Sequence, residues 1–142
     1  MSATTVTRID AHQHFWRLAR GDYRWLKPSL TPIHRDFGVD DLRPLAAAAG
    51  VTGTVLVQAA PTEAETHFML ETARASAGLV RGVVGWVDLA APDAPSRIAV
   101  RAADPLMRGL RPMLQDIDDP GWILRPDPVS PPWPVTVCAL MR

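Results

Sequence analysis

Residues 52–58 read Thr-Gly-Thr-Val-Leu-Val-Gln, an uncharged and largely β-branched run of strand length. A run of this kind indicates a strand that is buried on both faces, as in parallel sheets covered by helices. Residues 79–89 and 106–114 are two further largely apolar stretches that read as strands, and helical patterns occupy residues 62–78 and 92–103 between them. Strands and helices therefore alternate along the chain. This alternation predicts an α/β fold built from parallel βα units.

Upstream of this region, the stretch Ile-Asp-Ala-His-Gln-His at residues 9–14 predicts a short first strand with histidines at its carboxyl end. A long connection, residues 17–36, contains glycine and prolines and leads to a predicted helix over residues 39–50, with Asp40 as its N-cap. Connections of such length are usually functional or disordered. The predicted order is β-loop-α-β-α-β-α-β.

Two helix starts are predicted from particular residues. Thr62 followed by Glu65 is the signature of a capping box at the start of a helix. The next helix is expected to begin at Ser96, because Pro95 interrupts its pattern.

Composition excludes several classes of protein. The 142 residues suffice for one domain, and 15 basic against 15 acidic residues give no net charge, which argues against a nucleic-acid partner. The one cysteine, Cys138, excludes an intrachain disulfide. No apolar run is long enough for a membrane span, and residues 1–8 lack the apolar core of a signal peptide. We therefore expect a soluble cytoplasmic protein with no membrane partner.

The last residues differ in composition from the rest. Five of the 14 prolines lie between Pro126 and Pro134, which prevents a helix there. Residues 8–125 are therefore expected to form the folded domain, and residues 126–142 a proline-rich tail that is non-native or disordered.

The histidines at the end of the first strand are the strongest candidates for chemistry. His12 and His14 are two residues apart, so their side chains point to the same face of a strand. Neutral imidazole is a common metal ligand, but a closed site needs three or four ligands. The alternative is a pair of polar residues at a strand end, one of which caps a backbone group. His34 and His67 have no partner at ligand spacing and are expected to be structural or at the surface.

Other polar residues follow the later strands at equivalent positions. In parallel α/β proteins the carboxyl ends of the strands carry the ligand site. Arg111 is suited to hold an anion or a carboxylate, whereas Asp88 is equally suited to a turn or a helix cap. Glu65 is expected at the solvated start of a helix, and the alternative is that it reaches the same face as these residues. The candidate residues of this rim are Gln58, Trp86, Asp88 and Arg111.

These motifs together resemble the amidohydrolase-2 (amidohydrolase-related) family, and within it the sugar-lactone hydrolases of the L-fuconolactonase and L-rhamnonolactonase type. The similarity extends over residues 8–125 and is carried by Ile9-Asp10-Ala11-His12-Gln13-His14-Phe15-Trp16, Tyr23-Arg24-Trp25-Leu26, Arg35-Asp36-Phe37, Val55-Leu56-Val57-Gln58-Ala59, Glu63-Ala64-Glu65-Thr66, Gly82-Val83-Val84-Gly85-Trp86-Val87-Asp88 and Gly109-Leu110-Arg111-Pro112-Met113-Leu114-Gln115.

The resemblance implies a distorted (β/α)₈ barrel that hydrolyses the ester bond of a small sugar-acid lactone at its C-terminal mouth, using activated water. It implies that His12 and His14 bind one divalent, zinc-like metal ion or contact the substrate without a metal. It also places Gln58, Trp86, Asp88 and Arg111 among the substrate-binding groups. The general base of the family is an aspartate on the last strand, which has no matching position here, so no catalytic residue is identified.

The length departs from the family pattern. Such a barrel takes roughly 250 residues, and this chain supplies about four βα units. We therefore expect the N-terminal half of a lactonase-type hydrolase, truncated after about four strands and inactive. The alternative is a non-catalytic half-barrel that folds only by self-association, as a homo-oligomer, or with a complementary half. The sequence does not select the lactone.

Overall fold

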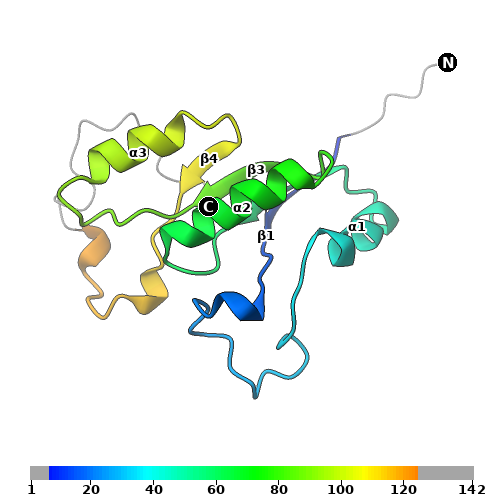
Figure 1. Ribbon diagram of the computed structural model, residues 1–142, viewed down its shortest axis with the longest axis horizontal. Helices are drawn as coiled ribbons and strands as arrows, with labels where there is room; N and C mark the ends of the chain where they lie inside the picture. Colours follow the sequence, from blue (N-terminus) through cyan, green and yellow to red (C-terminus); the bar gives the residue numbers. More distant parts are fainter. Residues whose placement is uncertain (1–6, 125–142) are drawn as a thin grey trace.

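The structure is a computed structural model that describes residues 7–124, so the predicted tail over residues 126–142 lies outside the described residues. Its four strands form one sheet in the order β1-β2-β3-β4, and all neighbouring strands pair in parallel (Figure 1). The strands are β1 (Ile9–Gln13), β2 (Gly53–Val57), β3 (Val80–Gly85) and β4 (Met107–Leu110). The α-helices are α1 (Val39–Ala48), α2 (Glu63–Ala75) and α3 (Ala94–Ala102). The predicted series of parallel βα units is confirmed.

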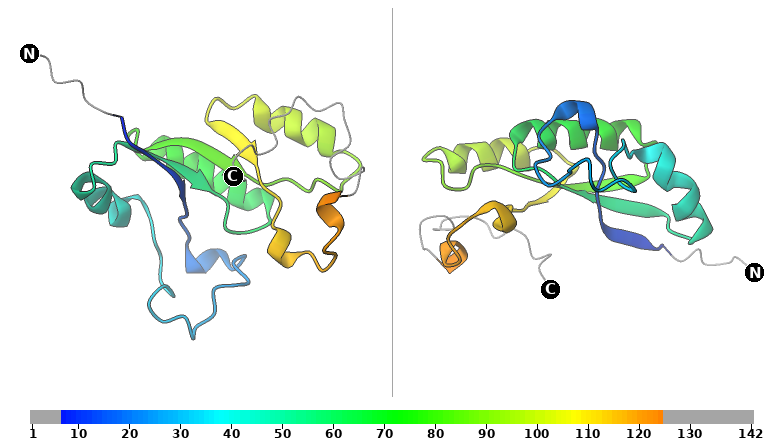
Figure 2. Two further views of the ribbon diagram at one scale, coloured as in Figure 1. Left: turned by 180° about the vertical axis from the view of Figure 1, so that it is seen from behind. Right: turned by 90° about the horizontal axis from the view of Figure 1, so that it is seen from below.

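Helices cover one face of this sheet. The right-hand view of Figure 2 shows α2 and α3 on the same side, with two short 3₁₀ helices, η2 (Leu114–Asp116) and η3 (Trp122–Leu124), on the other. Within residues 7–124, no helix has the length and apolar character needed to cross a membrane.

The core lies between α2 and the central strands. Leu56 of β2 and Val83 of β3 are paired in register, and both are fully buried together with Met69 of α2. Burying a side chain of this size contributes about 1.5–3 kcal/mol. This contact fixes α2 on the sheet and so determines where the first turn of α2 lies relative to the strand ends.

The predicted cap of α2 is confirmed, whereas the predicted cap of α1 is wrong. Thr62 is the N-cap of α2, and its Oγ1 accepts a hydrogen bond from Glu65 N at 3.0 Å. In α1 the N-cap is Gly38 rather than Asp40, and Gly38 N donates to Asp41 Oδ2 at 2.9 Å. An acidic side chain thus caps the helix end, but it reaches back from the third helical position.

Helix α3 also begins earlier than predicted. It starts at Ala94, with Asp93 as the N-cap, so Pro95 lies in its first turn. The N–H groups of the first turn have no partner within a helix, and proline, which has none, fits there without loss. Pro95 therefore starts the helix rather than interrupting it.

The long connection after β1 is ordered against the end of β2. It contains a 3₁₀ helix, η1 (Leu18–Arg20), and Trp16 and Phe37 close it by exchanging two backbone hydrogen bonds of 3.0–3.1 Å. Tyr23 is buried in a cluster with Ala59. Trp25 Nε1 donates to Ala59 O at 2.8 Å. The connection thus forms a wall beside the carboxyl end of β2.

Arginine side chains cross glycines at the amino-terminal part of the sheet. A Cβ on Gly53 of β2 would lie 2.6 Å from Arg81 Cγ of β3, and a Cβ on Gly82 of β3 would lie 2.5 Å from Arg108 Cγ of β4. Real Cβ atoms essentially never approach another atom so closely. Each glycine therefore leaves the space that the arginine stem of the next strand occupies. We call Gly53, Arg81, Gly82 and Arg108 the arginine–glycine ladder.

Candidate functional site

The two candidate metal ligands converge at the carboxyl end of β1. His12 lies in the strand and His14 just beyond it. Their Nε2 atoms are 3.2 Å apart, and their ring centroids are 4.9 Å apart in an edge-to-face arrangement. The two imidazoles share one face, as the alternation of a strand predicts.

The hydrogen bonds of His14 fix its tautomer. Its Nδ1 lies 2.8 Å from Val57 O. A carbonyl oxygen can only accept a hydrogen bond, so Nδ1 of His14 carries the proton and Nε2 carries a lone pair that faces His12. Burial lowers the pKa of His14 and is the largest cause of the shift. The hydrogen bond to Val57 O raises this pKa, and the charges of His12 and Arg111 lower it. His14 is therefore a neutral imidazole at pH 7, which is the form that binds metals.

The geometry of the pair fits two ligands of one ion. Two imidazole nitrogens bound to a tetrahedral zinc ion at 2.0–2.1 Å would lie about 3.3 Å apart, close to the 3.2 Å between the two Nε2 atoms. A backbone carbonyl behind the metal-facing ring, here Val57 O behind His14, is the usual support for such a ligand. Within residues 7–124, no three His, Cys, Asp or Glu side chains are placed to share an ion. Among the described residues, His12 and His14 are thus a pair with ligand spacing and have no third side chain of these types placed to share an ion with them.

Arg111 and Gln58 lie beside the histidine pair. Arg111 follows β4, and its Nη1 is 3.4 Å from His12 Nε2. Gln58 follows β2, is fully buried and donates from Nε2 to Arg111 O at 3.1 Å. Among the described residues, Gln58 Oε1 has no hydrogen-bond partner. We call His12, His14, Gln58 and Arg111 the histidine cluster; it presents a cation, imidazole lone pairs and an amide acceptor.

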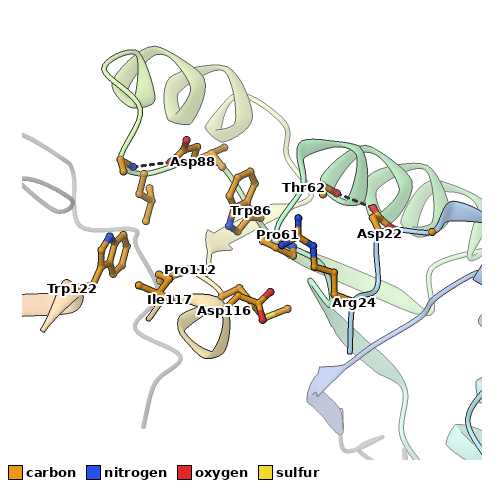
Figure 3. A pocket seen from close by; sticks show the side chains of 15 residues that line it. Asp22, Arg24, Pro61, Thr62, Trp86, Asp88, Pro112, Asp116, Ile117 and Trp122 are labelled. Atoms are coloured by element: carbon orange, nitrogen blue, oxygen red, sulfur yellow. Dashed lines mark hydrogen bonds between the residues drawn. The ribbon is translucent and has the colours of Figure 1, made fainter. Parts of the chain in front are cut away.

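Trp86 and Asp88 instead line a neighbouring cavity of about 460 Å³ (Figure 3). Thr66 of α2 fixes the backbone of Trp86, since its Oγ1 accepts from Trp86 N at 2.9 Å and donates to Trp86 O at 2.8 Å. Asp88 is exposed, and its Oδ1 accepts from Ala90 N at 3.0 Å, which is the turn contact considered as its alternative. None of the four members of the histidine cluster is among the described residues that line this cavity.

The sequence-predicted site residues therefore fall into two adjacent groups. Gln58 and Arg111 join the histidine pair, whereas Trp86 and Asp88 belong to the cavity. Five of the six follow the carboxyl ends of the parallel strands, where a ligand site was expected, and His12 lies within β1 one residue before its end.

Further residues of the cavity wall were not predicted. Asp22 and Arg24 come from the long connection after β1, and Thr62 comes from the N-cap of α2 (Figure 3). Asp22 Oδ2 accepts a hydrogen bond from Thr62 Oγ1 at 2.9 Å. The sequence offers no periodic pattern between residues 17 and 36 from which this fold of the connection could be derived.

The prediction for Glu65 is wrong. Its side chain is fully buried and accepts from Ala59 N at 3.0 Å and from Tyr23 Oη at 2.8 Å, with Arg20 Nη2 at 3.2 Å. Burial raises the pKa of Glu65, and these three donors oppose the rise. A signal was present, because Glu65 shares the buried stripe of α2 with Met69 and Ala73, four and eight residues further on.

Known proteins are similar to this chain in sequence. The family model described as Amidohydrolase (Amidohydro_2) matches residues 9–138. The chain is 52% identical over 125 residues to an L-fucono-1,5-lactonase of Burkholderia ambifaria, which covers 88% of this chain and 42% of that protein. It is 42% identical over 112 residues to an L-fucono-1,5-lactonase of Burkholderia multivorans, which covers 79% of this chain and 37% of that protein. The chain thus spans about two fifths of the length of these relatives.

Solved structures show the same likeness. A Burkholderia multivorans amidohydrolase with bound zinc superposes with a TM-score of 0.72 at 40% identity, over 80% of this chain and 39% of that one. An amidohydrolase 2 from Bifidobacterium longum subsp. infantis gives a TM-score of 0.58 at 25% identity, over 87% and 45% of the two chains. The four parallel βα units thus match part of the barrel of these proteins, and the chain belongs to the amidohydrolase-2 family.

Proposed function

We propose that this chain is the binding portion of a hydrolase that opens the ester bond of a sugar-acid lactone with water. The relatives named L-fucono-1,5-lactonase support this substrate class. The observation that carries the proposal is the convergence of His12, His14 and Arg111 within 3.2–3.4 Å at the carboxyl ends of β1 and β4.

In the proposed reaction, water attacks the carbonyl carbon of the lactone and negative charge develops on the carbonyl oxygen. Arg111 stabilises this charge because its guanidinium is permanently protonated and lies at the site before the substrate arrives. Gln58 supports Arg111 in this position, because its Nε2 donates a hydrogen bond to Arg111 O at 3.1 Å. The bond from the carbonyl carbon to the ring oxygen then breaks, and the ring oxygen takes up a proton as the sugar acid forms.

A divalent ion such as zinc fits between His12 and His14 and would lower the pKa of a bound water. His14 would hold it through Nε2, with Val57 O keeping the ring in place. Arg111 lies beside this position and would repel a cation, so the same residues also suit a reaction in which they contact the lactone directly.

We infer further that residues 7–124 do not hydrolyse the lactone unaided. Removing a proton from the attacking water requires a general base within hydrogen-bond reach. The described residues place no third carboxylate or imidazole with His12 and His14. The base would then come from outside residues 7–124, for instance from a complementary half of the barrel.

The test combines hydrolysis and metal binding. L-fucono-1,5-lactone hydrolysis is measured for the chain alone and after mixing with the separately produced remainder of the Burkholderia ambifaria relative. We expect hydrolysis only in the mixture. The rate of hydrolysis should fall by roughly 100-fold or more when the mixture contains the His12→Ala/His14→Ala variant. His34→Ala is the matched control, because His34 lies in the connection away from the cluster. Activity in the mixture that is indifferent to the double substitution would overturn the proposal.

Zinc titration by calorimetry provides a second measurement. The pair predicts one ion per chain with an affinity that depends on His12 and His14 and is unchanged in His34→Ala. A metal-independent hydrolase would instead give activity in the mixture without measurable zinc uptake.

The sheet edges favour a second candidate, a half-barrel that closes by self-association. Within the described residues, β1 and β4 each pair with one strand only. Two copies could join β4 of one to β1 of the other at both edges, which would leave no open edge. Light scattering coupled to size-exclusion chromatography tests this: a discrete dimer supports it, and a monomer contradicts it.

A further inference from the structure

Three polar side chains in the wall of the 460 Å³ cavity have no partner. Among the described residues, no hydrogen bond or ion pair engages the guanidinium of Arg24, the indole N–H of Trp86 or the carboxylate of Asp116. Arg24 and Asp116 are exposed and Trp86 is half-buried, so a molecule that enters the cavity can reach all three. Figure 3 draws these side chains reaching toward the same space. The cavity thus offers two donors and one acceptor to a ligand.

The backbone of Arg24 is held on both sides by its neighbours in the chain. Tyr23 Oη donates to the buried carboxylate of Glu65 at 2.8 Å. Trp25 Nε1 donates to Ala59 O at 2.8 Å, just beyond the end of β2. The long connection therefore fixes where Arg24 enters the cavity wall and leaves only its side chain to be ordered by a ligand.

Trp86 and Asp116 are also held through their backbones. Thr66 Oγ1 accepts from Trp86 N at 2.9 Å and donates to Trp86 O at 2.8 Å. Asp116 is the last residue of η2, and its N–H donates to Met113 O at 3.0 Å. The three unpaired groups therefore start from fixed positions around the cavity before a ligand binds.

The chemistry of the walls restricts the class of ligand. A carboxylate only accepts hydrogen bonds, whereas a guanidinium and an indole N–H only donate them, so the ligand needs donors and acceptors on one small frame. Buried Val87, Pro112 and Met113 add apolar surface, and the volume lies in the range of small-molecule sites. A sugar ring, with C–H faces and hydroxyl edges, meets both requirements. A purely anionic ligand would suit Arg24 but would be repelled by Asp116.

One contact joins this cavity to the histidine cluster. Arg111 Nη2 lies 3.7 Å from the sulfur of Met113, and Met113 lines the cavity. A ring bound in the cavity can therefore lie beside Arg111, with its hydroxyls toward Arg24 and Asp116.

We propose that Arg24, Trp86 and Asp116 determine substrate specificity by reading the ring hydroxyls of a sugar lactone in this cavity, with Asp116 accepting from one hydroxyl and Arg24 donating to another. This inference rests on the proposed function, which it deepens by assigning the residues that recognise the ring. The histidine cluster would act on the lactone carbonyl, and the cavity would read the hydroxyl pattern.

The test is binding of L-fucose, a non-hydrolysable ring, to the full chain, followed through the indole N–H signal of Trp86 in NMR spectra. Arg24→Met and Asp116→Asn should each raise the dissociation constant about tenfold, because each removes one charged hydrogen-bonding group that is exposed to solvent.

Each variant has a control of the same charge in the same segment. Lys27→Met and Asp118→Asn alter exposed residues, and neither is among the described residues that line the cavity. Both controls should leave the dissociation constant unchanged. Equal weakening in the controls would show an effect of net charge and would overturn the proposal.

A deoxy series links the effect to one hydroxyl. In the wild-type chain, one monodeoxy analogue of L-fucose should bind as weakly as L-fucose binds to Asp116→Asn, and that analogue should not weaken further in the variant. Additive losses for every analogue contradict the proposal. So does a stronger response to glycine than to L-fucose, because a zwitterion would then be the better match for Arg24 and Asp116.

A measurement on the wild-type chain avoids dependence on the folding of a variant. The Nε–H signal of Arg24 and the ¹³C signal of the Asp116 carboxylate should both shift when L-fucose saturates the cavity. If only the indole signal responds, or if none responds, the inference is wrong. Because binding is measured without hydrolysis, lactonase activity without L-fucose binding contradicts this inference alone, and binding without activity contradicts the proposed function alone.

Discussion

Helices α1 and α2 follow successive strands of the same sheet but contribute very differently to the molecule. Helix α1 buries one residue, Ala46, whereas α2 buries five: Glu65, Thr66, Met69, Leu70 and Ala73. A helix that follows a parallel strand by a short turn starts at the strand's carboxyl end, beside the site. Helix α2 does so, and its first turn supplies Thr62, Glu65 and Thr66 to the site region. Helix α1 follows the long connection, which takes over that role.

The largest expected contrast is in the free energy of unfolding, between truncations of an apolar side chain in each of the two helices. Met69→Ala removes a fully buried side chain of α2 and should lower the free energy of unfolding by about 2–5 kcal/mol. Leu45→Ala on α1, where the side chain is 67% exposed, should change it by less than about 0.5 kcal/mol. Urea unfolding followed by circular dichroism gives both values. Equal losses would show that α1 is packed as firmly as α2.

Glycine substitutions sharpen the comparison at a smaller scale. Gly82→Ala places a Cβ against the stem of Arg108 and should destabilise the sheet beside α2 by about 1–3 kcal/mol. Gly38→Ala at the start of α1 is the matched control, because no atom lies within 4 Å of its added Cβ. The same unfolding measurement applies. A loss at Gly38 that matches the loss at Gly82 would contradict the close approach of Arg108.

The buried carboxylate of α2 predicts a pH dependence. Because burial raises the pKa of Glu65, its contribution to stability is fully present below the ordinary value of 4.5 and is lost as pH rises through the raised pKa. Relative to Glu65→Gln, which does not titrate there, the wild-type chain should gain about 1 kcal/mol as pH falls from neutral to that value. Unfolding of both proteins across this range measures the difference.

The control for this prediction is Glu71→Gln, an exposed substitution on the same helix. A stability difference for Glu65→Gln that varies with pH no more than the difference for Glu71→Gln would contradict the assignment of a raised pKa to Glu65.

The smallest expected effect concerns the ion pairs between α2 and α3. Hydrogen bonds from Arg97 and Arg101 hold the pKa of Glu63 below its ordinary value of 4.5. Stability from these contacts is present above that value and is lost as pH falls through the lowered pKa, the opposite direction to Glu65. Glu63→Gln should reduce the loss of unfolding free energy at acid pH by less than about 1 kcal/mol, since the pairs are partly exposed. Urea unfolding of both proteins at several acid pH values measures this loss, and an equal loss in both would contradict the prediction.

The parts of the molecule that depend on local pattern were predictable. Short, largely apolar runs indicated the strands, and the spacing of His12 and His14 indicated rings on one face. Thr62 was identified as a cap because capping involves residues three apart in sequence. In each case the deciding interaction lies within a few residues of the chain.

The parts that depend on distant contacts were not predictable from pattern. The buried stripe of α2 placed Glu65 on the inward face, but the donors that allow its carboxylate to be buried there, on Arg20 and Tyr23, are more than forty residues away and have no local signal. Trp86 and Asp88 separate from the histidine cluster because η2 and the connection after β1 build a cavity around them. A strand-end position thus predicts proximity to the site, but it does not say which wall a side chain joins.

The arginine–glycine ladder has a consequence for how the strands find their alignment. Parallel neighbours that slip by one residue exchange the faces of all their side chains. In the slipped arrangement, Arg81 would lose the gap at Gly53 and meet a residue with a Cβ, and Arg108 would likewise lose the gap at Gly82. The observed alignment is therefore the one in which both arginine stems find a gap, and the ladder favours this register over one shifted by a residue.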